Sequence, residues 1–203
     1  MGVPVPPEPG PAPLPPVPKP APAPPASALT PLDLLFQIAA AGDRDHAVTV
    51  DVSAPRVRIN VDRLHFTVSS SRAGYVYLLM LGSDRTDFWL LFPNDVDRDN
   101  RIAAGGTLAL PRPGWRLTAA GPPGTDQLLA NVSEAPRDFS AAGLQPNPPF
   151  AAFRLNARGL IEGDAASAAQ RYVGQVRCPA PAAGPCPQTY GEALFSIEEV
   201  APP

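Results

Sequence analysis

Apolar residues occupy every second position in several short stretches of the chain after residue 47. The clearest are Val48–Val52, Val57–Val61 and Leu64–Val68, in which Thr, Asp, Arg, Asn or His residues fill the positions between. Because successive side chains of a strand point to opposite faces, this period of two predicts strands with one apolar and one solvated face. We therefore predict that all three belong to a sheet that is wet on one side.

Two other runs, Gly74–Leu81 and Phe88–Phe92, are apolar on both faces, and the turn-forming residues 82–86 separate them. Such runs indicate central strands that are covered on both sides and joined as a hairpin. Further strands are expected at Thr107–Leu110, Trp115–Thr118, Gln127–Val132, Tyr172–Val176 and Ala193–Ile197. Short strands at this spacing predict an all-β fold, mainly an antiparallel β-sandwich of immunoglobulin-like or similar type.

A short helix is predicted before the first strand. Thr30 can cap a helix that begins at Pro31, Asp33 completes a capping box, and Gly42 is a natural stop. The residues expected to share its apolar face are Leu32, Leu35, Phe36 and Ala39. This helix should lie at the edge of the sandwich, because the alternating pattern begins directly after it.

Residues 138–170 interrupt the strand pattern. No convincing strand is visible there, and short peripheral helices are predicted near Phe150–Leu155 and Asp164–Gln170. We expect this segment to be an excursion that packs on the sandwich before the last strands return to the sheet.

Proline divides the chain into two parts. Of 30 prolines in 203 residues, 13 lie in the first 25 positions. Such a segment cannot supply the N–H donors of a helix or an interior strand, so residues 1–29 are predicted to be a disordered, proline-rich linker. Residues 30–201 should form a single β-sandwich domain. Because the chain starts inside low-complexity sequence, we expect it to be a piece of a larger, membrane-anchored protein.

Charge and hydropathy exclude several classes of partner. The net charge is −3 and arginines are dispersed among carboxylates, which disfavours nucleic-acid binding. No apolar run approaches the roughly 18 residues that span a bilayer, and the first residues lack the pattern of a secretory signal. These observations leave two alternatives: a cytoplasmic protein, or a fragment whose export signal or anchor lies upstream.

Residues that could carry chemistry are few. Only two histidines are present, His46 and His65, and both are interpreted as ordinary loop and surface residues. Nucleophile elbows, phosphate-binding glycine loops and zinc-protease motifs are absent from the sequence. We therefore predict no catalytic residues and no cofactor.

The segment 94–100 resembles the opening of a calcium loop, because Asp95, Asp97 and Asp99 recur at every second position. The later ligand positions fail, since Asn100 and Gly106 stand where glycine and glutamate are required. We predict no metal site, and interpret the segment as a turn whose side chains bond their own backbone. If a metal did bind, these three aspartates would be its ligands.

The only two cysteines, Cys178 and Cys186, flank a proline-rich loop. Their spacing suits neither a redox pair nor a zinc site, so a small structural disulfide is predicted. Such a bond requires an oxidising compartment. We therefore expect a periplasmic or extracytoplasmic location, and the alternative, a cytoplasmic one, would require free thiols.

Several short motifs occur in a recognisable order. They are Gly74-Tyr75-Val76-Tyr77, Leu91-Phe92-Pro93-Asn94, Ile102-Ala103-Ala104-Gly105, Leu110-Pro111, Gly121-Pro122-Pro123-Gly124 and Gln127-Leu128-Leu129. In these motifs the chain resembles a bacterial domain family of unknown function. Its members occur at the C-terminus of serine/threonine protein kinases, beside caspase-like peptidases, and in envelope proteins near type VI secretion genes.

The resemblance covers a core of about residues 47–135, and the extension 136–201 looks like the kinase-associated subgroup through Arg137-Asp138-Phe139-Ser140 and the cysteine pair. It implies an all-β domain exported beyond a membrane helix and a proline-rich spacer. It supplies no catalytic residues. The motifs can also be explained by structure alone. Gly105, for example, is interpreted as a position that needs unusual backbone dihedrals.

Together these features predict a non-enzymatic interaction or sensory module of an envelope-facing signalling or secretion-associated protein, specifically the C-terminal extracytoplasmic domain of a serine/threonine kinase. The expected partner is an envelope protein or a cell-wall component. Two alternatives stay open: a metal-dependent carboxylate hydrolase that uses Asp95–Asp99, and a purely structural spacer domain of a secretion assembly.

Overall fold

A computed structural model describes residues 29–86, 88–153, 155, 159–161, 163–178 and 184–203. All of the predicted linker except Leu29 lies outside the described residues. In chain order the elements are α1 (Pro31–Ala40), β1 (Val48–Val52), β2 (Arg56–Arg58), β3 (Phe66–Ser70), β4 (Gly74–Leu81), β5 (Phe88–Phe92), β6 (Arg101–Ile102), β7 (Thr107–Leu110), β8 (Gly124–Ser133), β9 (Arg137–Asp138), the 3₁₀-helix η1 (Ser140–Ala142), β10 (Leu144–Asn147), β11 (Phe150–Phe153), α2 (Ala165–Tyr172), β12 (Gln175–Val176) and β13 (Tyr190–Val200).

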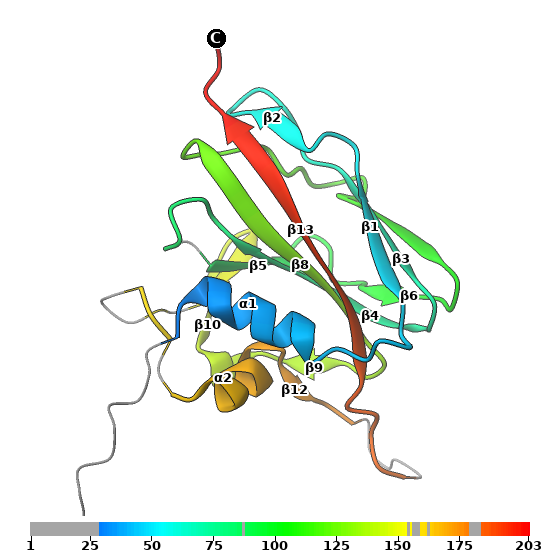
Figure 1. Cartoon of the computed structure of the whole chain (residues 1–203). Helices are drawn as coiled ribbons and strands as arrows, with labels where there is room; N and C mark the ends of the chain where they lie inside the picture. Colours follow the sequence, from blue (N-terminus) through cyan, green and yellow to red (C-terminus); the bar gives the residue numbers. More distant parts are fainter. Residues whose placement is uncertain (1–28, 87, 154, 156–158, 162, 179–183) are drawn as a thin grey trace, which may run out of the picture.

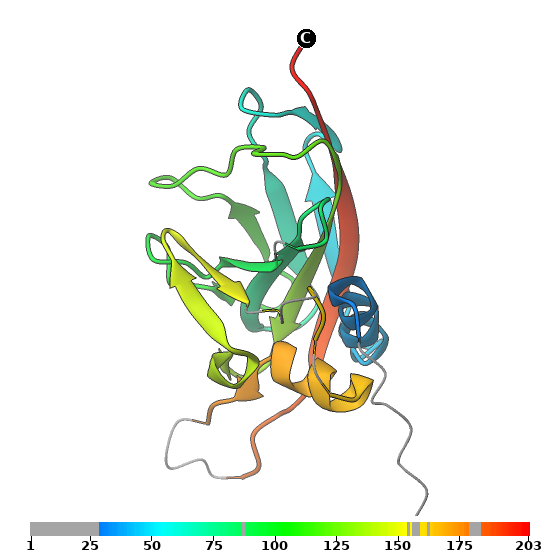
Figure 2. The same cartoon turned by 90° about the vertical axis from the view of Figure 1, so that its left-hand side faces the viewer.

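A large sheet forms the centre of the molecule, with strand order β10-β11-β5-β4-β8-β13-β2 and with β6 paired to β4. A smaller sheet, β1-β3-β7, packs against one of its faces, and helices α1 and α2 cover the other (Figures 1 and 2). Nearly all pairings are antiparallel, whereas β2 joins β13 in parallel. The fold is mostly β and agrees with the predicted sandwich.

Strand β4 divides two hydrophobic cores, as its doubly apolar sequence predicts. Val76 and Leu78 face the small sheet, while Leu79 and Leu81 face the helices. Its neighbour β8 runs antiparallel to it, with Leu79 opposite Leu129. A strand that is buried on both faces must be apolar at consecutive positions, and this explains why the alternation is lost here.

Helix α1 begins with the predicted capping box, in which Thr30 and Asp33 each bond the backbone of the other. The predicted apolar face was only partly right: Leu35 is buried, and Leu32 and Ala39 are half-buried. The helix buries Leu34, Leu35 and Ile38, whereas Phe36 is 50% exposed. Apolar residues surround most of this helix, so the sequence allowed two overlapping stripes and only packing on the sheet selects one.

The segment after residue 138 holds strands that the sequence did not reveal. Of the residues predicted as a helix near 150–155, Phe150–Phe153 form β11, which pairs with β10 and with β5. The run Phe150–Phe153 is too short to show a period, and pairing with the edge of β5 decides its conformation. The second predicted helix is confirmed as α2, with Asp164 as its N-cap.

Three other predicted strands differ. Residues 115–118 form only an isolated bridge, between Arg63 and Thr118. The strand expected at Tyr172–Val176 begins as the end of α2 and leaves only the short β12, which pairs with β9. Strand β2 ends at Arg58, and Val61 beyond it is 52% exposed. No helix within the described ranges is long and apolar enough to cross a membrane.

Candidate functional site

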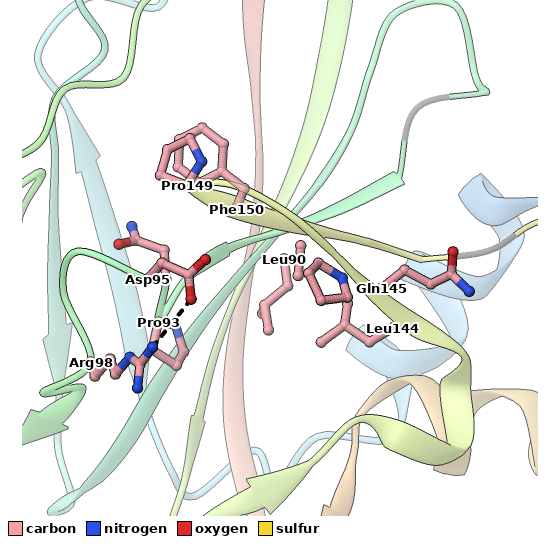
Figure 3. A pocket seen from close by; sticks show the side chains of 11 residues that line it. Leu90, Pro93, Asp95, Arg98, Leu144, Gln145, Pro149 and Phe150 are labelled. Atoms are coloured by element: carbon pink, nitrogen blue, oxygen red, sulfur yellow. Dashed lines mark hydrogen bonds and ion pairs between the residues drawn. The ribbon is translucent and has the colours of Figure 1, made fainter.

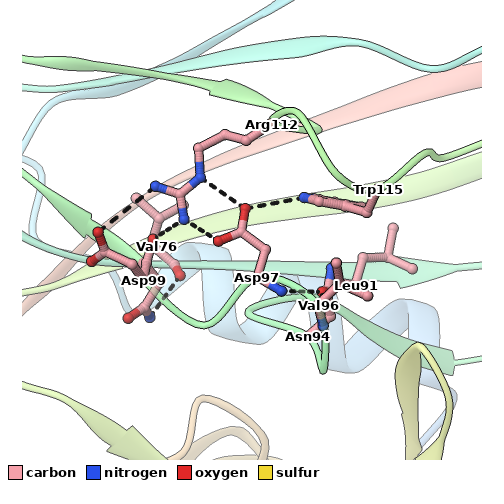
Figure 4. Close-up of polar contacts among 9 residues, drawn as sticks. Val76, Leu91, Asn94, Val96, Asp97, Asp99, Arg112 and Trp115 are labelled. Carbon is pink, nitrogen blue, oxygen red and sulfur yellow. Dashed lines mark hydrogen bonds and ion pairs between the residues drawn. The ribbon is translucent and has the colours of Figure 1, made fainter.

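The loop between β5 and β6 carries the three aspartates of the predicted metal alternative, and Asn94 organises its backbone. The Asn94 Nδ2 donates to the carbonyl of Leu91 at 3.0 Å, and its Oδ1 accepts from the N–H groups of Val96 and Asp97 at 3.0 and 2.9 Å (Figure 4). The turn interpretation is thereby confirmed, because an Asn side chain substitutes for backbone partners in this way.

Asp97 is the centre of a polar network at the edge of the inter-sheet core. It accepts two hydrogen bonds from the Arg112 guanidinium, one of them 2.8 Å long, and a third from the Trp115 indole N–H at 3.0 Å (Figure 4). The hydrogen bonds from Arg112 lower the pKa of the Asp97 carboxyl despite its partial burial. Arg112 also lies over the Phe92 ring, 5.7 Å from the ring centroid. The network therefore ties this loop to residues 112–115.

Of the other two aspartates, one pairs with another arginine and one lies near Arg112, the partner of Asp97. Asp95 forms an exposed ion pair with Arg98 at 3.3 Å, and the exposed Asp99 lies 3.9 Å from Arg112. The structure thus does not bring the three carboxylates together. Within the described ranges no three His, Cys, Asp or Glu residues are placed to hold a metal ion. The loop is neutralised by arginines instead.

A hollow of about 420 Å³ lies between this loop and the β10–β11 hairpin (Figure 3). The Asp95 N–H donates to the Pro149 carbonyl at 3.0 Å and connects the two walls. The lining residues are Leu90, Pro93, Asn94, Asp95, Arg98, Leu144, Gln145, Pro146, Pro149, Phe150 and Ala151. Apolar side chains and prolines dominate this set, while Asp95, Arg98 and Gln145 supply polar groups.

The two histidines occupy different surroundings. His65 is exposed on the small sheet, as predicted. His46 lies in a loop, as predicted, but is only 2% exposed. Its Nε2 lies 2.9 Å from the Ser70 Oγ, and burial lowers its pKa. Ser70 is itself 3% exposed, so this Ser–His contact is closed to substrates and acts in packing.

A pair of buried carboxylates, Asp126 on β8 and Glu199 on β13, was not found from the sequence. Their exposures are 4% and 5%, although both are acidic. The Ser83 N–H donates to Asp126 at 2.8 Å, and the Gly121 N–H donates to Glu199 at 2.5 Å. Burial and the neighbouring Glu199 raise the pKa of Asp126 to about 7. The strand register explains the pairing, because Asp126 lies opposite Ile197 and thus diagonal to Glu199 on one face.

Both residues of the pair line a second pocket, of about 180 Å³. The other residues that line it are Leu64, Met80, Gly82, Asp84, Trp89, Leu91, Leu117, Thr118, Ala120, Gly121, Pro122 and Phe150. Phe150 is the one residue shared with the first hollow. An apolar pocket with a few convergent polar groups and a shifted pKa has the general character of a binding site.

Cys178 and Cys186 form a disulfide, with Cα atoms 5.9 Å apart, which confirms the predicted bond. This separation lies within the usual range for disulfides. Residues 179–183 of the loop that it closes lie outside the described residues.

Comparison with known proteins identifies part of the chain. Residues 57–136 match the family model of a domain of unknown function, DUF4384. This part of the chain is thus similar to DUF4384 domains. Neither the curated proteins nor the solved structures contain a match. The DUF4384 match ends before β9, so both candidate sites combine residues inside it with residues of the C-terminal extension: Asp126 with Glu199, and Pro93 with Gln145.

Several residues of the motifs noted in the sequence have structural roles. Gly105 adopts a φ of +66°, which confirms the expected unusual dihedral. A Cβ on Gly74 would lie 2.5 Å from the Ser133 carbonyl oxygen, so this position excludes any other residue. In the extension, Arg137 donates to the Ser133 Oγ and to the carbonyls of Gly174 and Gln188. These residues therefore fix the local fold.

Proposed function

We propose that the chain is a non-enzymatic interaction module that faces the bacterial envelope. In this proposal it is the C-terminal extracytoplasmic domain of a membrane-anchored signalling protein such as a serine/threonine kinase. The Cys178–Cys186 disulfide supports an oxidising compartment. The resemblance to kinase-associated domains supports the signalling context, and the absence of catalytic motifs from the sequence supports a binding role.

The observation that carries the proposal is the hollow between the 93–98 loop and the β10–β11 hairpin. Its volume of about 420 Å³ falls in the range of ligand-binding clefts, about 300–1,000 Å³. Val96 on the loop is 56% exposed, one of few large apolar side chains so exposed in the described part of the chain. An exposed apolar residue on a loop that forms one wall of an apolar hollow, with polar groups around it, is typical of a protein-binding surface.

The hollow best suits an extended segment of a partner protein that inserts one apolar side chain. Leu90 and Leu144 provide apolar contacts, and Asp95 and Arg98 at the margin can bond a passing backbone. Strand β10 is at the edge of the large sheet, but its Pro146 has no N–H to offer an added strand. Side-chain insertion, and not strand addition, would therefore hold the partner.

A matched pair of substitutions tests this surface. Val96→Asp places a charge beside the hollow, and Val61→Asp makes the same change at a residue of similar exposure elsewhere, 52% against 56%. With a photo-crosslinker at Gln145, we expect the full chain to crosslink one defined envelope protein. Val96→Asp should weaken capture by about fivefold or more, while Val61→Asp retains it. Equal capture by both variants would contradict the proposal.

Two further measurements complete the test. Sedimentation with purified peptidoglycan should leave the chain in solution. Co-sedimentation that Val96→Asp abolishes would replace the protein partner with a cell-wall component. The sequence upstream of Met1 in the parent protein should contain a kinase domain and a membrane helix, and a parent that lacks both would contradict the signalling context.

A further inference from the structure

The pocket lined by Asp126 and Glu199 has an unusual charge distribution. Two carboxylates, each at least 95% buried, lie on adjacent strands and line a mainly apolar cavity. Each accepts one backbone N–H, from Ser83 and Gly121. Buried acids normally have a cationic partner.

The residues that line the pocket include no Arg, Lys or His. The charged groups that raise the pKa of Asp126 are Glu199 on β13, which also forms a hydrogen bond with the Asp126 side chain, and Asp84 in the turn after β4. The loop 119–122 and strand β3 bring no ionisable side chain to the pocket. The nearest ion pair on β13, between Glu198 and Arg56, is exposed, and Glu198 alternates with Glu199 along the strand. The lining of the pocket therefore carries acidic groups and no cationic side chain.

We propose that this pocket binds an alkylammonium group, with the cation against the hydrogen-bonded carboxyls of Asp126 and Glu199 and the alkyl arm against Met80, Trp89 and Leu91. This site goes beyond the proposed function, since it is lined by a different set of residues. Its occupant is either a free amine or a lysine side chain, and the chemistry is the same in both cases.

Size and wall chemistry support an alkylammonium over other ligands. The volume, about 180 Å³, is below the range of about 300–1,000 Å³ typical of drug-sized ligands and suits a single side-chain-sized group. Trp89 and Phe150 are aromatic, and aromatic faces attract organic cations. A calcium ion would need about six to eight oxygen ligands, far more than two carboxylates supply.

Protonation should be linked to binding. Without a cation, burial and Glu199 hold the pKa of Asp126 near neutrality, at about 7. An ammonium beside the pair favours the ionised carboxyl, so binding below that pH must release a proton. At pH 6 about one proton should leave per ligand, and at pH 8.5 almost none. Affinity should therefore rise by about tenfold between these two pH values.

Calorimetry on the full chain with n-butylamine tests the proposal, with n-butanol as the neutral ligand of matched size. Buffers of different ionisation enthalpy at pH 6 and pH 8.5 give the number of protons released. Asp126→Asn and Glu199→Gln should each weaken n-butylamine binding by at least about tenfold and reduce proton release at pH 6. Glu198→Gln is the matched control on the same strand, and it should bind like the wild type.

Each outcome decides the proposal. Preference for n-butylamine over n-butanol, lost in Asp126→Asn and retained in Glu198→Gln, supports it. Equal binding of the two ligands, no binding to the wild type, or equal losses in all three variants overturns it, and so does tight binding of calcium or magnesium ions at the same carboxylates. Thermal melts verify that the variants are folded. A peptide with one lysine, compared with its norleucine analogue, then distinguishes a partner's side chain from a free amine.

Discussion

Two groups of carboxylates in this molecule have opposite surroundings. In the loop 94–100, Asp95 and Asp97 have arginine partners, and the hydrogen bonds from Arg112 lower the pKa of Asp97. At the junction of β8 and β13, Asp126 and Glu199 line a pocket without cationic side chains, and the pKa of Asp126 rises to about 7. Aspartates close together in sequence lie in an exposed turn that arginines can reach. The Asp126–Glu199 pair, which strand pairing brings together, is buried, and Glu199 disfavours ionisation of Asp126.

The largest effect expected from this comparison concerns Asp97. Asp97→Ala removes the acceptor for Arg112 and for the Trp115 indole, and the Asp97 side chain is only 11% exposed. A guanidinium and an indole N–H would both lose a partner, so the free energy of unfolding should fall by about 2–3 kcal/mol. Urea denaturation at pH 7 measures this change.

A double-mutant cycle isolates the pair. If the network couples the two side chains, Asp97→Ala combined with Arg112→Ala should cost clearly less than the sum of the two single changes. Additive costs would mean that Asp97 contributes through the turn alone and not through Arg112. The pair would then resemble the exposed ion pairs of the surface.

The second effect has the opposite sign. The folded-state pKa of Asp126, about 7, exceeds its ordinary value of 3.8, so the folded state retains a proton that the unfolded state loses. Stability should therefore fall as the pH rises from about 4 to about 7 and then level off. Asp126→Asn removes this loss and should raise the free energy of unfolding at pH 8 by about 1–3 kcal/mol.

Asp62, whose pKa is lowered and not raised, is the control for the direction of this pH dependence. Hydrogen bonds from Arg58 lower the pKa of Asp62 to about 2, so its contribution to stability is present above about pH 4 and is lost as the pH falls through 2. Asp62→Asn should therefore alter only the acid limb of the pH profile. An Asp126→Asn profile that still slopes like the wild type between pH 4 and 7 would show that Asp126 is not the group responsible.

The sequence predicted the elements whose patterns are local. The capping box at Thr30 and the alternation of Val48–Val52 depend on neighbouring residues, and both are confirmed. It missed β11, because Phe150–Phe153 becomes a strand only through pairing with β5. For the same reason it missed the Asp126–Glu199 pair, since no pattern within β8 or β13 indicates which residues of the two strands will be diagonal neighbours.

The partners of the acidic loop were also beyond sequence reasoning. Its Asx turn at Asn94 was predictable from composition, but Arg112 reaches Asp97 only because residues 110–115 return past the β5–β6 loop. The sequence thus identified a place where carboxylates gather, without the arginine that neutralises the central one. Local spacing alone makes such a loop look more like a metal site than it is.

The smallest expected effect completes the contrast between the two kinds of carboxylate. Asp95 and Arg98 form an ion pair at 3.3 Å, but their side chains are 52% and 79% exposed. Exposed pairs contribute little because water screens the charges and ordering the side chains has an entropic cost. Asp95→Ala should change the free energy of unfolding by less than about 0.5 kcal/mol, and urea denaturation beside Asp97→Ala measures both on one scale. A cost for Asp95 equal to that for Asp97 would mean that the loop acts as one acidic unit, for which a shared ligand would again be the simplest explanation.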